Sequence, residues 1–291
     1  MTQHTVLGRV AAGALAVFTL VSVHAAEDKY FDSAGVRIRY VEAGSGEPVV
    51  LVHGYTTDIE QQFVQTGVFP GLAKGYRTIA LDARGHGKSG KPHDPKQYGP
   101  QMGLDVVRLL DHLGIPKAHI VGYSMGAHIV AQLVTTNPER FTTMTLGGAS
   151  GRRNWTEDDE RRVRIESAEM DEGMLRSQIV RLWPRDQPPP SDEEVRKRSA
   201  ERLVGKDPRA LAAVRRSNRD QVVSGAQMTA VKVPTLGVVG SADPYLKEFQ
   251  DLKRLMPQMT LVVIEGASHG SAPGRPEFLR AIEEFLAADR K

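Results

Sequence analysis

The segment Gly122-Tyr123-Ser124-Met125-Gly126 places a serine where a strand is predicted to turn into a helix. The apolar residues 118–121 precede it, and a helical pattern covers residues 127–136. The flanking glycines allow a tight turn, so the Ser124 hydroxyl is expected at the edge of a sheet. The Met125 N–H, at the start of the helix, is placed to bind negative charge on an attacked carbonyl oxygen. The segment therefore predicts a nucleophile for acyl transfer.

A serine hydroxyl needs a base and an orienting carboxylate to act as a nucleophile near neutral pH. Asp243 lies in the loop after the strand-like run 235–240, and His269 lies in the turn after the run 259–264. The carboxyl ends of parallel strands meet at one edge of a sheet, so these side chains are expected to converge. The chain order Ser, Asp, His fits a doubly wound α/β scaffold. We predict Ser124 as nucleophile, His269 as base and Asp243 as the orienting acid.

Other residues compete for these roles. Ser124 could be an ordinary helix N-cap. His128 follows one turn later, but the serine of such a turn points away from its own helix, so His128 is expected on the helix or at the surface. The rival acids Asp158 and Asp207 do not follow a predicted strand. The other histidines show no ligand spacing, so no metal site is expected, and acyl transfer needs no cofactor.

Strand and helix patterns alternate along most of the chain. Residues 31–41 alternate around Gly35, as an antiparallel hairpin does. Buried strands are expected at 49–52, 78–81, 120–121 and 143–146, and helices at 59–72, 98–113, 127–134 and 276–288. The alternation predicts an α/β fold, a doubly wound and mostly parallel sheet with helices on both faces.

The alternation stops in residues 151–227, which are rich in charged residues and carry sparse apolar residues at helical spacing. Helix-start signals recur in this stretch, for example at Thr156 and Ser191. We therefore predict a helical insertion at 151–227 between two parts of one core, residues 26–150 and 228–291.

Four ordered segments resemble the α/β-hydrolase superfamily. They are the strand and His-Gly loop at 50–55, the D-x-R-G-x-G-x-S turn at 82–89, the nucleophile elbow at 122–126, and the pair Asp243 and His269. The resemblance covers nearly the whole chain after residue 30. It implies an α/β-hydrolase fold in which the backbone N–H groups of Tyr55 and Met125 bind the oxyanion.

The insertion resembles the helical cap of many members of this superfamily. The resemblance implies that it roofs the crevice and shapes a small-substrate pocket. The pocket residues expected on this basis are Tyr55, Tyr123, Met170, Met174 and Trp183. The apolar residues of the insertion could instead only pack it onto the core.

The resemblance implies a carboxylesterase-like serine hydrolase that cleaves a small ester by two-step acyl transfer. Serine relatives also include carbon–carbon bond hydrolases, lactonases, perhydrolases and aminopeptidases, which sequence separates poorly. An aminopeptidase would need acids aimed at a substrate amine, and a solvated helix face explains Glu166, Glu169 and Asp171 more simply. Epoxide and carbon–halogen chemistry use an aspartate where this chain has Ser124. The alternative outside enzymes is a ligand-binding protein on a hydrolase scaffold.

Composition excludes other classes. The 291 residues carry a net charge of +3 without a concentrated basic stripe, which argues against nucleic-acid binding. A small molecule is therefore the expected partner, and the oligomeric state stays open. The chain has no cysteine, which excludes disulfides and a lipid-modified N-terminal cysteine and suits a bacterial periplasm.

The first residues have the pattern of a secretory signal. Arg9 precedes the apolar run 10–23, and small residues follow at the positions that a signal peptidase prefers. The run is shorter than the roughly 20 residues of a spanning helix. We predict a signal peptide at 1–25, cleavage after Ala25, a periplasmic or secreted protein, and no stable membrane span after cleavage. The alternative is an uncleaved N-terminal anchor.

Overall fold

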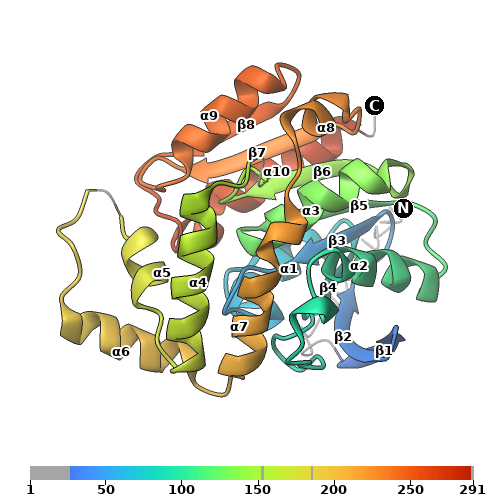
Figure 1. The fold of residues 1–291 in the computed structure, drawn as a ribbon. Helices are drawn as coiled ribbons and strands as arrows, with labels where there is room; N and C mark the ends of the chain where they lie inside the picture. Colours follow the sequence, from blue (N-terminus) through green and yellow to red (C-terminus); the bar gives the residue numbers. More distant parts are fainter. Residues whose placement is uncertain (1–26, 152–153, 185, 290–291) are drawn as a thin grey trace, which may run out of the picture.

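The computed structural model describes residues 27–151, 154–184 and 186–289, so the predicted signal peptide lies outside the described residues. Figure 1 shows one sheet flanked by helices, with strand order β1-β2-β4-β3-β5-β6-β7-β8. The strands are β1 (Lys29–Ser33), β2 (Val36–Ala43), β3 (Pro48–Val52), β4 (Arg77–Leu81), β5 (Ala118–Tyr123), β6 (Phe141–Gly147), β7 (Thr235–Gly240) and β8 (Thr260–Ile264).

Strands β3 to β8 run parallel, and β2 is antiparallel to both β1 and β4. The turn between β1 and β2 holds Ala34 and Gly35, both at positive φ, which confirms the predicted hairpin. All six residues of β5 are buried, as expected for a strand covered on both faces. The prediction of a doubly wound, mostly parallel sheet is therefore confirmed.

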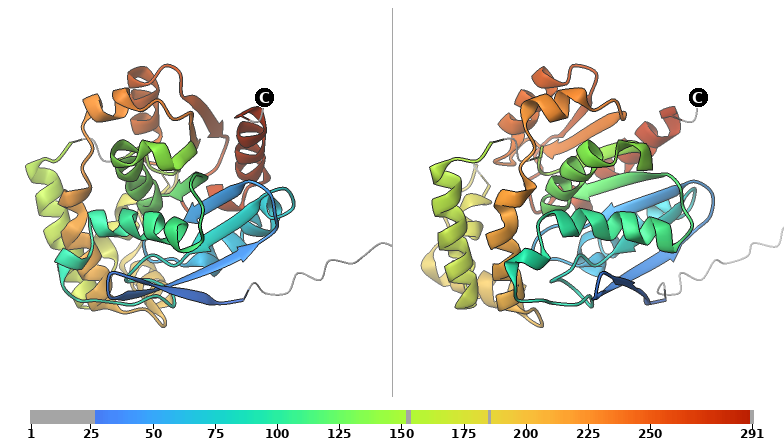
Figure 2. Two further views of the ribbon diagram at one scale, coloured as in Figure 1. Left: turned by 90° about the vertical axis from the view of Figure 1, so that its right-hand side faces the viewer. Right: turned by 45° about the vertical axis from the view of Figure 1, so that its right-hand side comes forward.

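Helices cover both faces of the sheet (Figure 2). Side chains of α1 and α10 pack with one buried cluster, and those of α2, α3 and α9 pack with the other. The helices are α1 (Val68–Leu72), α2 (Pro100–His112), α3 (Met125–Thr136), α4 (Glu157–Asp171), α5 (Arg176–Arg181), α6 (Asp192–Leu203), α7 (Pro208–Arg216), α8 (Gly225–Ala230), α9 (Leu246–Leu255) and α10 (Pro276–Asp289).

The continuous helix predicted at 59–72 is wrong. A single π-helical turn, η1 (Glu60–Val64), is followed by the short α1. Gly67 lies between them at φ +82°, a left-handed conformation that ends the first turn. The other three predicted helices correspond to α2, α3 and α10.

Helices α4 to α7, here called the insertion helices, come between β6 and β7 and gather beside the sheet in Figure 1. Thr156 and Asp159 form the reciprocal cap at the start of α4. The Ser191 side chain accepts a hydrogen bond from the N–H of Glu194 and so caps α6. The boundary expected at residue 227 falls inside α8, which already packs against α3 and α9.

Candidate active site

Ser124 occupies the turn between β5 and α3 in a backbone conformation that only glycine adopts easily, with φ +54° and ψ −110°. Its two flanking glycines cannot be replaced without a collision. A Cβ at Gly122 would lie 2.3 Å from the backbone oxygen of Gly126, and a Cβ at Gly126 would lie 2.0 Å from that of Val52. The glycines thus let β5, the turn and the neighbouring strand approach closely, as the spacing predicts.

The three side chains that the sequence singles out meet at this turn. His269 Nε2 lies 3.0 Å from Ser124 Oγ, and His269 Nδ1 lies 2.9 Å from Asp243 Oδ2. A carboxylate oxygen can only accept, so Nδ1–H donates to Asp243 and leaves Nε2 to accept from the serine hydroxyl in the neutral ring. Asp243 is buried and also accepts a 2.9 Å bond from the Tyr245 N–H. This arrangement can remove a proton from Ser124.

Two tyrosines hold the imidazole. The Tyr123 hydroxyl donates to the backbone oxygen of His269 at 2.5 Å, and its ring lies 5.5 Å from the His269 ring. The Tyr245 ring stands edge-on at 5.6 Å. Burial, followed by the charge of Asp243, raises the pKa of Tyr123 well above its ordinary value. Tyr123 therefore stays protonated and remains a donor.

The loop after β3 lies against the serine turn. A Cβ at Gly54 would come within 3.4 Å of the Ser124 Cβ, and Thr57 Oγ1 donates to the Gly54 oxygen at 2.8 Å. On the other side of Ser124, Met125 begins α3, whose first N–H groups have no partner within the helix. The two backbone segments expected to bind an oxyanion, at Tyr55 and Met125, therefore adjoin Ser124.

His53 orders this loop. Its Nδ1 lies 2.7 Å from the Gly54 oxygen, and its Nε2 accepts from the Ala83 N–H at 3.0 Å. Burial lowers its pKa below the ordinary value, because a charged ring would lose its solvation. His53 is thus a neutral link between the loops after β3 and β4.

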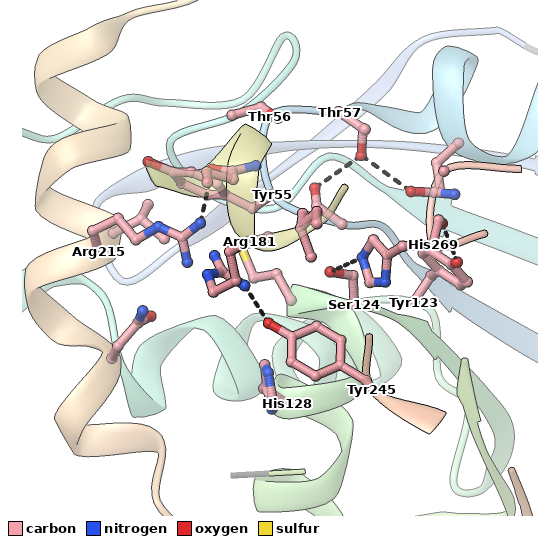
Figure 3. Close-up of a pocket in the computed structure, with 18 of the residues that line it drawn as sticks. Tyr55, Thr56, Thr57, Tyr123, Ser124, His128, Arg181, Arg215, Tyr245 and His269 are labelled. Carbon is pink, nitrogen blue, oxygen red and sulfur yellow. Dashed lines mark hydrogen bonds between the residues drawn. The ribbon is translucent and has the colours of Figure 1, made fainter. Parts of the chain in front are cut away.

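Ser124 opens into a pocket of about 820 Å³ between the core and the insertion helices. Tyr55, Tyr123 and His269 line it, together with His128, which the sequence reasoning had assigned to the helix or the surface (Figure 3). The Tyr55 hydroxyl donates to the Leu211 oxygen of α7 at 2.9 Å, which fixes one wall.

The prediction that Met170, Met174 and Trp183 line the pocket is wrong, because the lining contains none of the three. Met170 is buried in the hydrophobic core cluster. The Trp183 indole donates to the Pro188 oxygen, and the Arg198 guanidinium lies 4.6 Å over its ring. Most apolar side chains of the insertion pack inward, and its residues in the pocket lining are mostly polar, with Leu182 and Val214 as apolar members.

Arg181 of α5 and Arg215 of α7 supply much of that polar wall. Both pair with Glu166 of α4, at 2.8 and 3.0 Å. Arg181 also donates to the Tyr245 hydroxyl, and the Arg215 guanidinium lies 4.0 Å over the Tyr55 ring. The pocket wall therefore carries two guanidinium groups that are fixed in place.

The expectation that Glu166, Glu169 and Asp171 form a solvated face is wrong for Glu166, which is buried between the two arginines. Burial by itself raises the pKa of Glu166, but the charges of Arg215 and Arg181 outweigh it and hold that pKa below its ordinary value. Glu169 accepts hydrogen bonds from Ser177 at the start of α5. Asp171 pairs with an arginine at the surface.

Sequence reasoning missed Arg181, Arg215 and Tyr245. The only available signal was for Tyr245, which stands two residues after Asp243 in the same loop. The rival acids have other partners, since Asp158 pairs with an arginine of its own helix and Asp207 caps α7.

In the part of the chain that the structure describes, no group of three or more acidic or histidine side chains is arranged to hold a metal ion. None of the helices in those residues is long and apolar enough to cross a membrane.

Comparison with known proteins places this site in context. The sequence profile of the alpha/beta hydrolase fold matches residues 47–273. Esterase YbfF of Escherichia coli (strain K12) is 27% identical over 246 residues, which cover 83% of this chain and 94% of that protein. The 2-hydroxy-6-oxo-6-(2'-aminophenyl)hexa-2,4-dienoic acid hydrolase of Metapseudomonas resinovorans is 33% identical over 43% of each chain.

Among solved structures, a thermophilic esterase from Thermogutta terrifontis superposes with a TM-score of 0.75 at 24% identity, over 91% of this chain and 100% of that chain. This likeness bears on the fold alone. The first curated relatives that the chain matches are longer proteins, of which it spans about a third, 32% and 31%. The profile match covers well over half of the sequence, and the chain therefore belongs to the α/β-hydrolase fold family.

Proposed function

We propose that this protein is a serine hydrolase that cleaves a small ester by two-step acyl transfer. The observation that carries the proposal is the hydrogen-bonded series Ser124, His269 and Asp243 at the floor of a substrate-sized pocket. The membership of the family supports hydrolase chemistry, and the likeness to an esterase over most of both chains supports an ester as substrate.

In the first step Ser124 Oγ attacks the substrate carbonyl carbon while His269 Nε2 takes its proton. Asp243 stabilises the imidazolium that forms. The carbonyl oxygen becomes negative and is bound by the backbone N–H groups of Tyr55 and Met125. The tetrahedral intermediate then collapses, the alcohol leaves with the proton from His269, and the acyl group stays on Ser124.

In the second step His269 takes a proton from a water molecule, whose oxygen attacks the acyl carbon. A second tetrahedral intermediate forms at the same two N–H groups and expels Ser124 Oγ. His269 returns the proton to this oxygen, and the carboxylic acid leaves. Every proton transfer in this sequence uses one nitrogen, which already lies within hydrogen-bond distance of Ser124.

Hydrolysis of a 4-nitrophenyl ester series, acetate through dodecanoate, tests the proposal. Ser124→Ala is expected to lower kcat by about 10⁴-fold or more, because the nucleophile is lost while the pocket is kept. The dependence of wild-type kcat/KM on the length of the acyl chain would report the depth of the pocket. Ester cleavage that persists in Ser124→Ala would overturn the proposal.

A carbon–carbon bond hydrolase is the second candidate, because the pocket wall presents Arg181 and Arg215 and one relative is named for a dienoic acid. Turnover of a 2-hydroxy-6-oxohexa-2,4-dienoic acid faster than any ester would favour it. The lactonase and perhydrolase activities stay as alternatives, and the same kind of kinetic comparison with the esters can test them. An aminopeptidase would need acids aimed at a substrate amine, but Glu166 is engaged by two arginines. Glu169 accepts from Ser177 and Asp171 pairs with an arginine at the surface, so the geometry does not favour that activity.

We also propose that residues 1–25 act as an export signal and that the mature protein is periplasmic or secreted. The sequence pattern around Arg9 and Ala25 carries this proposal. Expression of the full chain in a bacterium, fractionation and intact-mass measurement are expected to give a protein that begins at residue 26. A cytoplasmic protein with residues 1–25 retained would contradict it.

A further inference from the structure

Arg181 and Arg215 lie close together, since both contact the single carboxylate of Glu166. Their side chains are mostly buried, with 23% and 12% of their surface exposed, and both residues line the pocket. Within the described residues, one negative charge thus faces two positive ones, and Glu166 itself is only 4% exposed. The group keeps a net positive charge next to the pocket.

The two guanidinium groups are close to the reacting atoms. Arg181 bonds the Tyr245 hydroxyl, and the Tyr245 ring contacts His269. Arg215 covers the ring of Tyr55, whose backbone N–H is a proposed oxyanion donor. Figure 3 shows both guanidinium groups between α7 and Ser124. A substrate acylating Ser124 would therefore reach them with its far end.

A guanidinium group stays protonated in proteins, so both arginines present positive charge to the pocket. Burial alone lowers the pKa of Arg181, but the contributions of Tyr245 and Glu166 are together larger, so the pKa lies above its ordinary value. Arg215 donates to Gln178 at 2.8 Å, which fixes the guanidinium without neutralising it. Two fixed planar donors in the pocket wall match the two oxygens of a carboxylate.

The pocket also contains acids, namely Asp159, Glu201, Glu248 and Asp251. Asp159 pairs with Arg162, and Asp251 pairs with Lys247 and Arg254. The lining also holds Glu201, Glu248 and the cation Arg202. The Glu166 group differs from these because two guanidinium groups share a single carboxylate there.

We propose that Arg181 and Arg215 bind a carboxylate at the distal end of the acyl chain, so that the preferred substrates are monoesters of dicarboxylic acids. This inference rests on the proposed acyl transfer at Ser124. The carboxylate would displace water from the two guanidinium groups and hold the ester carbonyl at Ser124. Neutral acyl chains of the same length would leave these charges without an anion and would be poorer substrates.

Three esters of equal acyl length test the proposal: mono-4-nitrophenyl adipate, its neutral methyl ester, and 4-nitrophenyl hexanoate. The adipate is expected to have the highest kcat/KM. Arg181→Gln and Arg215→Gln are each expected to lower kcat/KM for the adipate roughly 10- to 100-fold, through KM more than kcat. The loss on the adipate should exceed the loss on either neutral ester, so that the ratio of kcat/KM for adipate to that for hexanoate falls, and Arg181→Lys should restore part of this ratio.

Arg216→Gln is the matched control. Arg216 stands next to Arg215 on α7 but pairs with Asp171 at the surface, outside the pocket lining, so the variant should keep the adipate preference. A wild type that prefers the neutral esters would overturn the carboxylate site. Equal losses on all three esters in the Arg181 and Arg215 variants would also overturn it, because they indicate a purely structural role.

A binding measurement separates this inference from the proposed function. Titration of monomethyl adipate into Ser124→Ala by calorimetry needs no turnover. If the wild type cleaves no ester, the proposed acyl transfer is wrong, and the calorimetric binding data alone test the carboxylate site. The dissociation constant of monomethyl adipate is measured for Ser124→Ala and for the double variant Ser124→Ala with Arg181→Gln. A value roughly tenfold or more higher in the double variant supports the site, and equal values overturn it.

Discussion

His269 is held from both sides of its ring. Nδ1 faces the buried carboxylate of Asp243 and Nε2 faces the hydroxyl of Ser124. The Tyr123 hydroxyl holds the backbone of the same residue. At the scale of single residues, the role proposed for Asp243 is therefore to select the tautomer whose Nε2 can accept a proton.

Asp243→Asn tests this selection. The asparagine amide can donate to Nδ1, which favours the tautomer that cannot act as a base, so kcat is expected to fall by about 10⁴-fold with a smaller change in KM. Steady-state kinetics on 4-nitrophenyl esters measure both constants, and circular dichroism checks that the fold is kept. A kcat within about tenfold of the wild type would show that Asp243 does not set the tautomer.

At the scale of elements, the joint between β5 and α3 is the most constrained part of the site. Gly126, the second residue of α3, lies against the backbone of Val52 in β3, so strand and helix approach more closely than any side chain allows. Ser124 keeps its unusual backbone conformation because both neighbouring elements are fixed by the sheet and the core.

Gly126→Ala is expected to lower the free energy of unfolding by about 3 kcal/mol, because the new methyl group meets a backbone oxygen that cannot move alone. Gly103→Ala is the control. A Cβ at Gly103, inside α2, would lie 3.5 Å from Leu133, an ordinary contact, and the helix should gain up to about 1 kcal/mol. Urea unfolding measures the free energy of unfolding of both variants. If the two variants were equally stable, the inferred collision between a Cβ at Gly126 and the backbone of Val52 would be wrong.

At the scale of the whole molecule, the insertion helices are part of the packed structure. Their apolar side chains, Met170, Leu175, Ile179, Val195 and Leu211, belong to the same buried cluster as the helices α2 and α3. Polar contacts add to this packing, since Tyr55 bonds α7 and His93 lies 2.9 Å from Asp207. Glu166 links three insertion helices through Arg181 and Arg215.

Glu166→Gln is expected to lower the free energy of unfolding by about 3 kcal/mol at neutral pH, since it leaves two buried cations without an anion. The folded state lowers the pKa of Glu166 from its ordinary 4.5. Its stabilisation is therefore complete above pH 4.5 and is lost as pH falls through the lower folded-state pKa.

The difference in stability between wild type and Glu166→Gln should accordingly shrink in acid. Urea unfolding of both proteins at pH 7 and well below pH 4.5 gives this comparison. A difference that grows as pH falls would contradict the assignment of Glu166 as the charged partner of the two arginines.

The sequence by itself determined the features that depend on neighbouring residues. The apolar runs before Ser124, Asp243 and His269 predict strands, and parallel strands bring their carboxyl ends to one edge. The side chains could therefore be expected to meet before any distance was known. The break at Gly67 was missed, because the apolar periodicity of 59–72 continues through it.

The tertiary structure alone decided the chemistry of the pocket wall. Glu166, Arg181 and Arg215 come from three helices and look like solvated charges in sequence, because charged residues occur all around these helices. Which face turns inward depends on how the helices pack on one another and on the core. That packing buries Met170 away from the pocket and brings the two arginines into it, a long-range outcome that local periodicity does not encode.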